Sequence, residues 1–225
     1  MKVLSIIVPL YNEAKTVSYV IQQLIDLETV GWDKEIIVVD DGSKDASGQI
    51  LKKFVSRIVY IRHPFNQGKG AAIRTGLLKA RGQAILVQDA DFEYSPADIP
   101  ALLKIFSDSV AVYGSRNLSP RRQGYLPYIW GVRILTSLVN LFYKQQLTDV
   151  YTGYKLFPTG IIKKIPLKSR GFEFEIEATV KLLKARVKII EVPISYQPRQ
   201  FRQGKKIRAK DGVKGLAVLI KSLFG

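Results

Sequence analysis

The chain has 225 residues, and its 35 Lys and Arg against 19 Asp and Glu give a formal net charge of +16. This length can bury one sizeable core, and an apolar content of 47% argues against an intrinsically disordered chain. The absence of cysteine from the sequence excludes disulfide frameworks and thiolate metal sites, and it fits a cytoplasmic protein. The positive charge calls for an anionic partner, which nucleic acid, a phosphorylated ligand or an anionic membrane surface could supply.

The first half of the sequence alternates short apolar runs with amphipathic segments of helical spacing. The runs predict strands at residues 3–10, 35–40, 58–61, 84–88 and 110–113. The segments between them predict helices at residues 14–27, 46–57, 71–81 and 97–106. This alternation is typical of βαβ units, so we expect an α/β fold with a mostly parallel sheet and helices on both faces.

The second half departs from this alternation, although we expect residues 1–225 to form a single domain. Residues 121–144 mix basic with aromatic side chains and predict one or two amphipathic helices. The remaining elements expected are a helix at 172–184, a strand at 187–196, a basic loop at 197–210 and an amphipathic helix from Gly212.

Three apolar stretches bear on the relation to membranes, at residues 3–10, 134–143 and 215–220. None approaches the roughly 20 residues needed to span a bilayer. The first is too short for a secretory signal and is followed by polar residues instead of a cleavage site. The other two end beside basic residues and could lie on a membrane surface without crossing it.

Acidic side chains follow the strand expected at residues 84–88, where Asp89, Asp91 and Glu93 alternate. Open α/β sheets bind ligands at the carboxyl ends of their strands. Carboxylates this close repel one another unless a cation lies between them, and hard oxygen ligands suit Mg²⁺ or Mn²⁺. The segment therefore predicts a divalent metal that holds a phosphorylated ligand.

Two other strands end in polar turns. Asn12 and Glu13 have two equally good interpretations, helix capping or contacts to a nucleotide base or ribose. Asp40 and Asp41 precede Gly42, and a capped turn explains the glycine better than it explains two adjacent acids. Because parallel strands end at one edge of the sheet, these turns and the acids at 89–93 favour a common ligand site.

Basic and glycine-rich segments complete the set of motifs. Residues 66–70 place Lys69 between glycines, which suits a phosphate but lacks the spacing of a P-loop or a dinucleotide fingerprint. Arg116 ends the fifth strand and could bind a phosphate through two parallel hydrogen bonds. The basic loop at 197–210 is either solvated surface or a mobile cover for a diphosphate. His63 precedes a proline in a predicted loop, and we assign it no catalytic role.

Together these segments resemble the GT-A-type glycosyltransferases of family 2, within the branch of dolichol-phosphate mannose synthase and related polyprenyl-phosphate hexosyltransferases. The resemblance covers nearly the whole chain in the expected order and rests on residues 8–13, 40–43, 66–70, 89–91, 114–116, 152–154 and 202–206. It implies a GT-A, Rossmann-like sheet, with a nucleotide-binding half at 1–116 and an acceptor-binding, membrane-facing half at 117–225.

The resemblance also implies roles for individual residues. The nucleotide-binding set is Pro9, Tyr11, Glu13, Asp40, Asp41, Lys69 and Asp89. The metal set is Asp89, Asp91 and Glu93, and the set that contacts the acceptor phosphate is Ser115, Arg116 and Arg133. The residues expected to act in catalysis are Asp91, Arg116, Arg202 and Lys206, the last two from a flexible loop over the active site. Lys205 stands where the family commonly has a serine, which leaves the contacts of that loop open.

The predicted reaction is an inverting transfer of a hexose from a nucleoside-diphosphate sugar to a polyprenyl or dolichyl phosphate. It depends on Mg²⁺ or Mn²⁺, and GDP-mannose and UDP-glucose are both open as donors. A lipid phosphate is already anionic, so no strong protein base is required. We expect the protein to be cytoplasmic and peripheral on the inner face of an anionic membrane, and a membrane-anchoring partner or a downstream anchoring segment is left open.

Two alternatives change the acceptor or the partner. Transfer to a hydroxyl of a glycan or glycolipid would require a carboxylate base, for which Glu173, Glu175 and Asp149 are the candidates. On a helix Glu173 shares a face with Glu177, while Glu175 points elsewhere. The remote alternative is a basic nucleic-acid-binding protein, but such a protein needs no acidic cluster. The sequence also has none of the common nucleic-acid motifs, so we expect no nucleic-acid partner.

Overall fold

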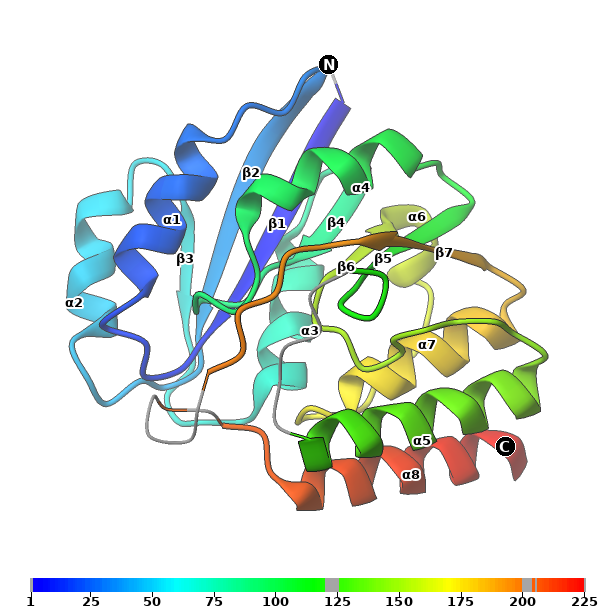
Figure 1. Cartoon of the computed structure of the whole chain (residues 1–225). Coiled ribbons are helices and arrows are strands. Elements are labelled where there is room, and N and C mark those ends of the chain that lie inside the picture. The colour runs from blue at the N-terminus through cyan, green and yellow to red at the C-terminus, as the bar shows by residue number, and fades with distance from the viewer. Residues whose placement is uncertain (1, 120–125, 200–203, 205, 225) are drawn as a thin grey trace.

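A seven-stranded sheet runs through the computed structural model, which describes residues 2–119, 126–199, 204 and 206–224. The strands lie in the order β3-β2-β1-β4-β6-β5-β7 (Figure 1). Their bounds are Lys2–Leu10 (β1), Trp32–Asp40 (β2), Val59–Arg62 (β3), Ala84–Val87 (β4), Val110–Ser115 (β5), Lys155–Pro158 (β6) and Lys188–Pro193 (β7). A strand occurs at each apolar run that predicted one.

Helices cover both faces of this sheet. Their bounds are Val17–Asp26 (α1), Ser47–Leu51 (α2), Lys69–Lys79 (α3), Ile99–Ile105 (α4), Leu126–Tyr143 (α5), Thr159–Ile162 (α6), Phe174–Lys184 (α7) and Ala209–Phe224 (α8). Short 3-10 turns at Lys52–Phe54 and Pro96–Asp98 extend α2 and precede α4. The α/β class with a mostly parallel, doubly covered sheet is therefore confirmed.

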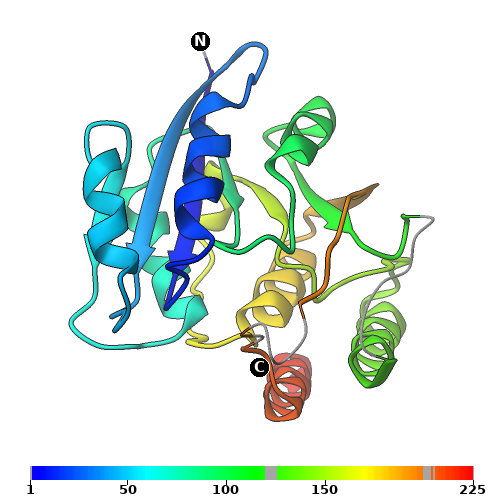
Figure 2. The same cartoon turned by 60° about the vertical axis from the view of Figure 1, so that its left-hand side comes forward.

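Side chains of the central strand β1 alternate between two hydrophobic clusters, as the two-residue period of a strand requires. Leu4, Ile6 and Val8 pack into the cluster formed with α1, α2 and α4. Ile7 points the other way, into the cluster that includes residues of α3, α5, α7 and α8. Figure 2 shows the resulting three layers, with α1 and α4 on one side of the sheet and α7 on the other. The near-continuous apolar runs follow from burial on both faces.

The strand β6 is the main departure from the sequence prediction, which had no strand there. It pairs antiparallel with both β4 and β5, whereas β1 pairs parallel with β2 and β4. Its four residues are all buried, and they include the charged Lys155. A short strand with a lysine in it has no recognisable apolar pattern, and this explains why sequence periodicity missed it.

The helices α5 and α8 run side by side in the same direction along one edge of the molecule (Figure 1). Leu135 of α5 faces Gly215 of α8, and the hydroxyl groups of Tyr143 and Ser222 are 2.8 Å apart. The single helix α5 satisfies the prediction for 121–144, of which residues 121–125 lie outside the described part. The helix expected from Gly212 begins earlier, at Ala209. Among the described helices, none is both long enough and apolar enough to cross a bilayer.

Candidate active site

A cavity of about 360 Å³ lies where β1, β2 and β4 end, the edge at which the sequence placed a common site. The predicted residues that line it are Pro9, Tyr11, Glu13, Asp41, Lys69, Asp89, Asp91, Glu93 and Lys206. Within the described part of the chain, the lining does not include Asp40, Ser115, Arg116 or Arg133, and Arg202 is outside that part. The structure thus brings together the residues from the strand ends and Lys206 from the end of the chain.

The acids of this cavity are held by cations of the chain itself. Arg199 contacts Asp91 and donates two hydrogen bonds of 3.0 Å to the carboxylate of Glu13. Lys69 lies 2.7 Å from Asp89. Burial and the neighbouring Asp89 raise the pKa of Asp91 to about 7, although Arg199 opposes this shift. At Asp91, burial and the neighbouring acid thus outweigh the attraction of Arg199.

Glu93 is placed differently from the two aspartates. Its carboxylate accepts a 2.8 Å hydrogen bond from the backbone N–H of Arg199 and a 3.0 Å hydrogen bond from the hydroxyl of Tyr196. Nowhere in the described residues do three acidic or histidine side chains gather as a metal site. The structure thus does not assemble the expected set of Asp89, Asp91 and Glu93 into a three-carboxylate centre.

Asp89 and Asp91 nevertheless fit a divalent cation bound together with a phosphorylated ligand. Mg²⁺ in such sites takes one or two carboxylates, and phosphate oxygens and water complete its shell. The two side chains leave the end of β4 into one cavity, and each already attracts a cationic side chain there. Their donor atoms are the hard oxygens that Mg²⁺ and Mn²⁺ prefer.

The adjacent acids Asp40 and Asp41 have separate tasks. Asp40 is fully buried and accepts hydrogen bonds from the backbone of Ser43 and the hydroxyl of Tyr60, so it supports the turn after β2. Asp41 lines the cavity and accepts hydrogen bonds from the backbone N–H groups of Gln67 and Gly68. It therefore fixes the glycine-rich segment that carries Lys69.

His63 also belongs to this support. Its Nδ1 lies 2.7 Å from the carboxylate of Asp41, and its Nε2 lies 2.9 Å from the hydroxyl of Thr75 on α3. The ring is buried and does not line the cavity, in line with its exclusion from the catalytic residues.

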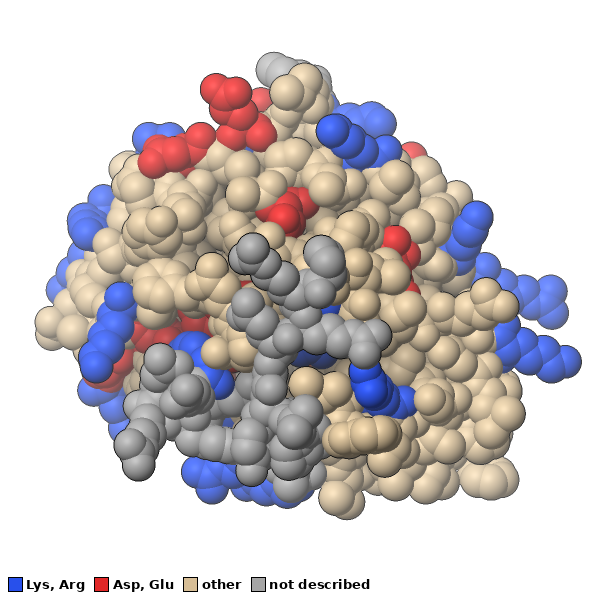
Figure 3. All heavy atoms as spheres, in the orientation of Figure 1, with Lys and Arg blue, Asp and Glu red and all other residues tan. Residues whose placement is uncertain are grey.

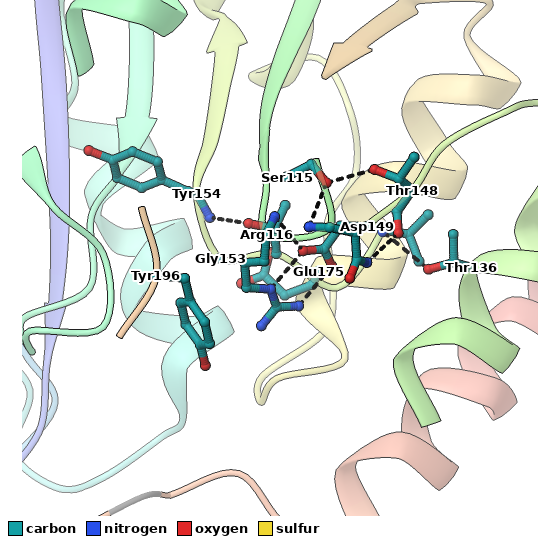
Figure 4. Close-up of polar contacts among 12 residues, drawn as sticks. Ser115, Arg116, Thr136, Thr148, Asp149, Gly153, Tyr154, Glu175 and Tyr196 are labelled. Carbon is teal, nitrogen blue, oxygen red and sulfur yellow. Dashed lines mark hydrogen bonds and ion pairs between the residues drawn. The ribbon is translucent and has the colours of Figure 1, made fainter. Parts of the chain in front are cut away.

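Arg116 forms an ion pair with Asp149, a buried aspartate of the loop before β6 (Figure 4). Its guanidinium donates hydrogen bonds of 2.6 Å and 2.7 Å to the two carboxylate oxygens of Asp149, and it lies over the ring of Tyr196. Burial alone would lower the pKa of Arg116, but Asp149 outweighs it and raises that pKa further. The hydroxyl of Ser115 lies 2.6 Å from that of Thr148. The pair Arg116–Asp149 is thus connected to the cavity through Tyr196, whose hydroxyl donates a hydrogen bond to Glu93.

Arg133 lies on α5, and its guanidinium is stacked over the ring of Trp130 at 5.6 Å. Its role at the acceptor phosphate stays a prediction, as do the roles of Ser115 and Arg116.

A second buried pair lies behind Lys69. The carboxylate of Glu175 on α7 is 3.2 Å from Lys69 and 2.9 Å from Lys155, which has no exposed surface. Burial lowers the pKa of Lys69, but Asp89 and Glu175 outweigh this effect and raise it. Lys69 thus forms an ion pair with Asp89 at the cavity and a second one with Glu175, which does not line the cavity.

Arg199 is a site residue that the sequence reasoning missed. The sequence places Arg199 in the basic loop at 197–210 and predicts Arg202 as the arginine of the site. The usable signal was its position after β7, which is parallel to β5 and ends at the same edge of the sheet. The rule that selected Arg116 at the end of β5 applies to the chain that leaves β7 as well.

Comparison with known proteins identifies the family. Residues 5–165 match the model of "Glycosyl transferase family 2". The chain belongs to this family. It is 31% identical to UDP-N-acetylglucosamine–dolichyl-phosphate N-acetylglucosaminyltransferase of Methanococcus voltae over 240 residues, which cover 95% of this chain and 93% of the relative. It is 28% identical to undecaprenyl-phosphate mannosyltransferase of Micrococcus luteus, over all of this chain and 94% of the relative.

Solved structures of the same fold include glucosyl-3-phosphoglycerate synthase of Mycobacterium tuberculosis in complex with Mn²⁺ and UDP-glucose. It superimposes with a TM-score of 0.76 over 98% of this chain and 79% of that one, at 18% identity. The expected GT-A-type fold and the assignment as a glycosyltransferase are thus confirmed.

Proposed function

We propose that this glycosyltransferase moves a hexose from a nucleoside-diphosphate sugar to a polyprenyl phosphate, with inversion and with Mg²⁺ or Mn²⁺ at Asp89 and Asp91. The observation that carries the proposal is the cavity at the ends of β1, β2 and β4, where buried acids and bases meet. The two relatives named for dolichyl and undecaprenyl phosphate match the chain over nearly its whole length, which supports this acceptor class.

The residues of the cavity suit a leaving diphosphate. Lys69, Arg199 and Lys206 provide cationic groups, and Tyr11 offers an aromatic surface at the end of β1. A bound divalent metal would neutralise charge on the departing diphosphate oxygens. Fixed cations in a poorly solvated cavity stabilise such charge more than water does. These groups do not distinguish GDP-mannose from UDP-glucose, because both donors carry a diphosphate.

The positions of the candidate bases support a phosphate acceptor. Two of the three carboxylates considered as a base for a hydroxyl acceptor are held by cations, Asp149 by Arg116 and Glu175 by two lysines. The third, Glu173, accepts hydrogen bonds from backbone N–H groups at Oε1, while its Oε2 is buried without a hydrogen-bond partner among the described residues. As far as the chain is described, none of the three lines the cavity. The oxygen of a lipid phosphate is anionic without a base, so the geometry favours a phosphate acceptor over a glycan hydroxyl.

The acceptor is tested by incubating purified protein with radiolabelled GDP-mannose, UDP-glucose or UDP-N-acetylglucosamine, Mn²⁺ and either a polyprenyl phosphate or a glycolipid. We expect one donor to label the polyprenyl phosphate and chelation of the metal to abolish the product. Labelling of the glycolipid alone would replace this proposal with transfer to a hydroxyl.

A surface suited to a membrane lies along α5 and α8. Trp130, Ile134 and Leu141 form an exposed apolar stripe on α5, at spacings that put them on one face. Val213, Ile220 and Phe224 form a corresponding stripe on α8. In Figure 3 the surface over α5 is largely uncharged, and Lys and Arg gather around its edges. Such a pattern is typical of helices that lie in the headgroup region of an anionic bilayer, which supports peripheral attachment at the inner face.

This surface predicts the effect of Leu141→Glu combined with Ile220→Glu. Each apolar side chain that leaves a bilayer forfeits about 1.5–3 kcal/mol, so we expect at least a 10-fold loss of sedimentation with vesicles of phosphatidylcholine and phosphatidylglycerol. The control is Val30→Glu with Leu78→Glu, because these apolar side chains are even more exposed but lie outside the two stripes. Equal losses in both double variants would contradict the assigned surface, and so would wild-type binding that is insensitive to salt.

A further inference from the structure

Arg199 occupies the centre of the acidic cluster. Its guanidinium contacts Asp91 and bridges to Glu13, and its backbone N–H holds Glu93. The side chain is 15% exposed, so the ion pairs form in a largely desolvated place. One cation therefore joins the acids that follow β1 and β4.

The contact with Asp91 uses one particular oxygen. The Oδ1 atom of Asp91 accepts a 3.0 Å hydrogen bond from the backbone N–H of Glu93, and Arg199 contacts Oδ2. A divalent cation held by Asp91 would therefore either share Oδ2 with Arg199 or bind at Oδ1 directly beside the guanidinium. Two cations at one carboxylate oxygen repel each other strongly when solvent is scarce.

We propose that Arg199 is the internal counter-cation of the metal site, and that it competes with the divalent metal for Asp91 until a diphosphate is bound. This inference rests on the proposed metal-dependent function. A phosphate can replace the lost partner of the guanidinium through two parallel hydrogen bonds. Metal and diphosphate should then each strengthen the binding of the other, because a metal alone meets Arg199 at Asp91 and a diphosphate alone meets the carboxylates of the cluster.

Lys69 does not play the same part. It lies 2.7 Å from Asp89 but also 3.2 Å from Glu175, so it keeps a buried acidic partner when Asp89 turns to a metal. The described ion pairs of Arg199 all involve acids of the cluster, namely Glu13, Asp91 and Glu93. Arg199 keeps Glu13 when it leaves Asp91, but Glu13 also lines the cavity, whereas Glu175 does not. Arg199 is therefore the cation that a metal at Asp91 meets directly.

The test is the affinity for Mn²⁺, measured by calorimetry or from the EPR signal of free Mn²⁺, with and without GDP or UDP. Without nucleotide we expect Arg199→Gln to bind Mn²⁺ at least about 10-fold more tightly than the wild type, since a neighbouring charge changes a carboxylate's affinity for a proton by about 10- to 1,000-fold. With nucleotide the difference between the two proteins should shrink. Arg199→Lys keeps the positive charge but loses the planar guanidinium, so its affinity for Mn²⁺ should rise less than that of Arg199→Gln.

The matched control is Arg208→Gln, which removes the same charge from an exposed side chain that lines the same cavity. An equal gain in this control, or an unchanged affinity in Arg199→Gln, would overturn the competition. If Arg199→Gln fails to fold, as judged by circular dichroism, an unchanged affinity in Arg199→Lys overturns it instead. If Mn²⁺ binds the wild type only in the presence of nucleotide, the proposed function stands whether or not Arg199 competes with the metal. No Mn²⁺ binding under any condition would overturn both.

Discussion

Asp91→Asn should reduce the rate of sugar transfer by about 1,000-fold or more while the protein stays folded. Loss of one charge-stabilising group at a leaving oxyanion costs about 100- to 1,000-fold in known enzymes, and here the lost group also holds the metal. The fold should tolerate the change, because the amide oxygen can still accept the hydrogen bond from the backbone N–H of Glu93. The measurement is the initial rate of lipid-linked sugar formation at saturating donor and Mn²⁺, with the thermal midpoint as a check on folding.

The control for this prediction is Asp108→Asn. Asp108 is exposed in the turn between α4 and β5, so the same chemical change there should leave the rate within about twofold of the wild type. A rate for Asp91→Asn within threefold of the wild type would remove Asp91 from the reaction, even if the family assignment stood. Equal losses in both variants would point to a general effect of charge and away from a specific ligand.

The location of the site could be predicted because it depends on topology. Parallel strands end at one edge, so polar residues after β1, β2 and β4 had to meet once the βαβ pattern was recognised. That reasoning works at the level of strands and does not assign side chains to faces. Asp40 and Asp41 show the limit: a strand's side chains alternate, so Asp40 turns to the interior and Asp41 to the cavity.

The cations of the site were harder to predict than the acids. The acids follow strands directly, whereas Arg199 comes from a segment that returns across the sheet after β7 to reach Glu13 (Figure 1). Contacts between residues so far apart in sequence depend on the path of a loop, which has no periodic pattern. Sequence reasoning found that basic residues of 197–210 would meet the acids, and Lys206 does so. It could not determine which arginine would.

Lys155 is the residue whose role the sequence concealed most completely, and it gives the largest expected effect on stability. Its ammonium group has no exposed surface and donates hydrogen bonds to Glu175 and to the backbone oxygens of Val150 and Thr152. Burial lowers the pKa of Lys155, while Glu175 opposes that shift. The lysine thus ties α7 to the loop that carries Asp149, the partner of Arg116.

Lys155→Met should therefore lower the free energy of unfolding by about 3–5 kcal/mol, because it leaves a buried carboxylate and two buried carbonyl groups without their donor. Urea unfolding measures this change. The control Lys164→Met, at an exposed lysine just after α6, should change the free energy of unfolding by less than about 0.5 kcal/mol.

The double variant Lys155→Met, Glu175→Gln tests whether the two side chains act as a pair. Its free energy of unfolding should fall by less than the sum of the two single losses, since the unpaired charge is gone. Strict additivity would show that the two side chains do not act as a pair. A loss below 1 kcal/mol in Lys155→Met would mean that Lys69 alone is sufficient to neutralise Glu175, which lies 3.2 Å from it.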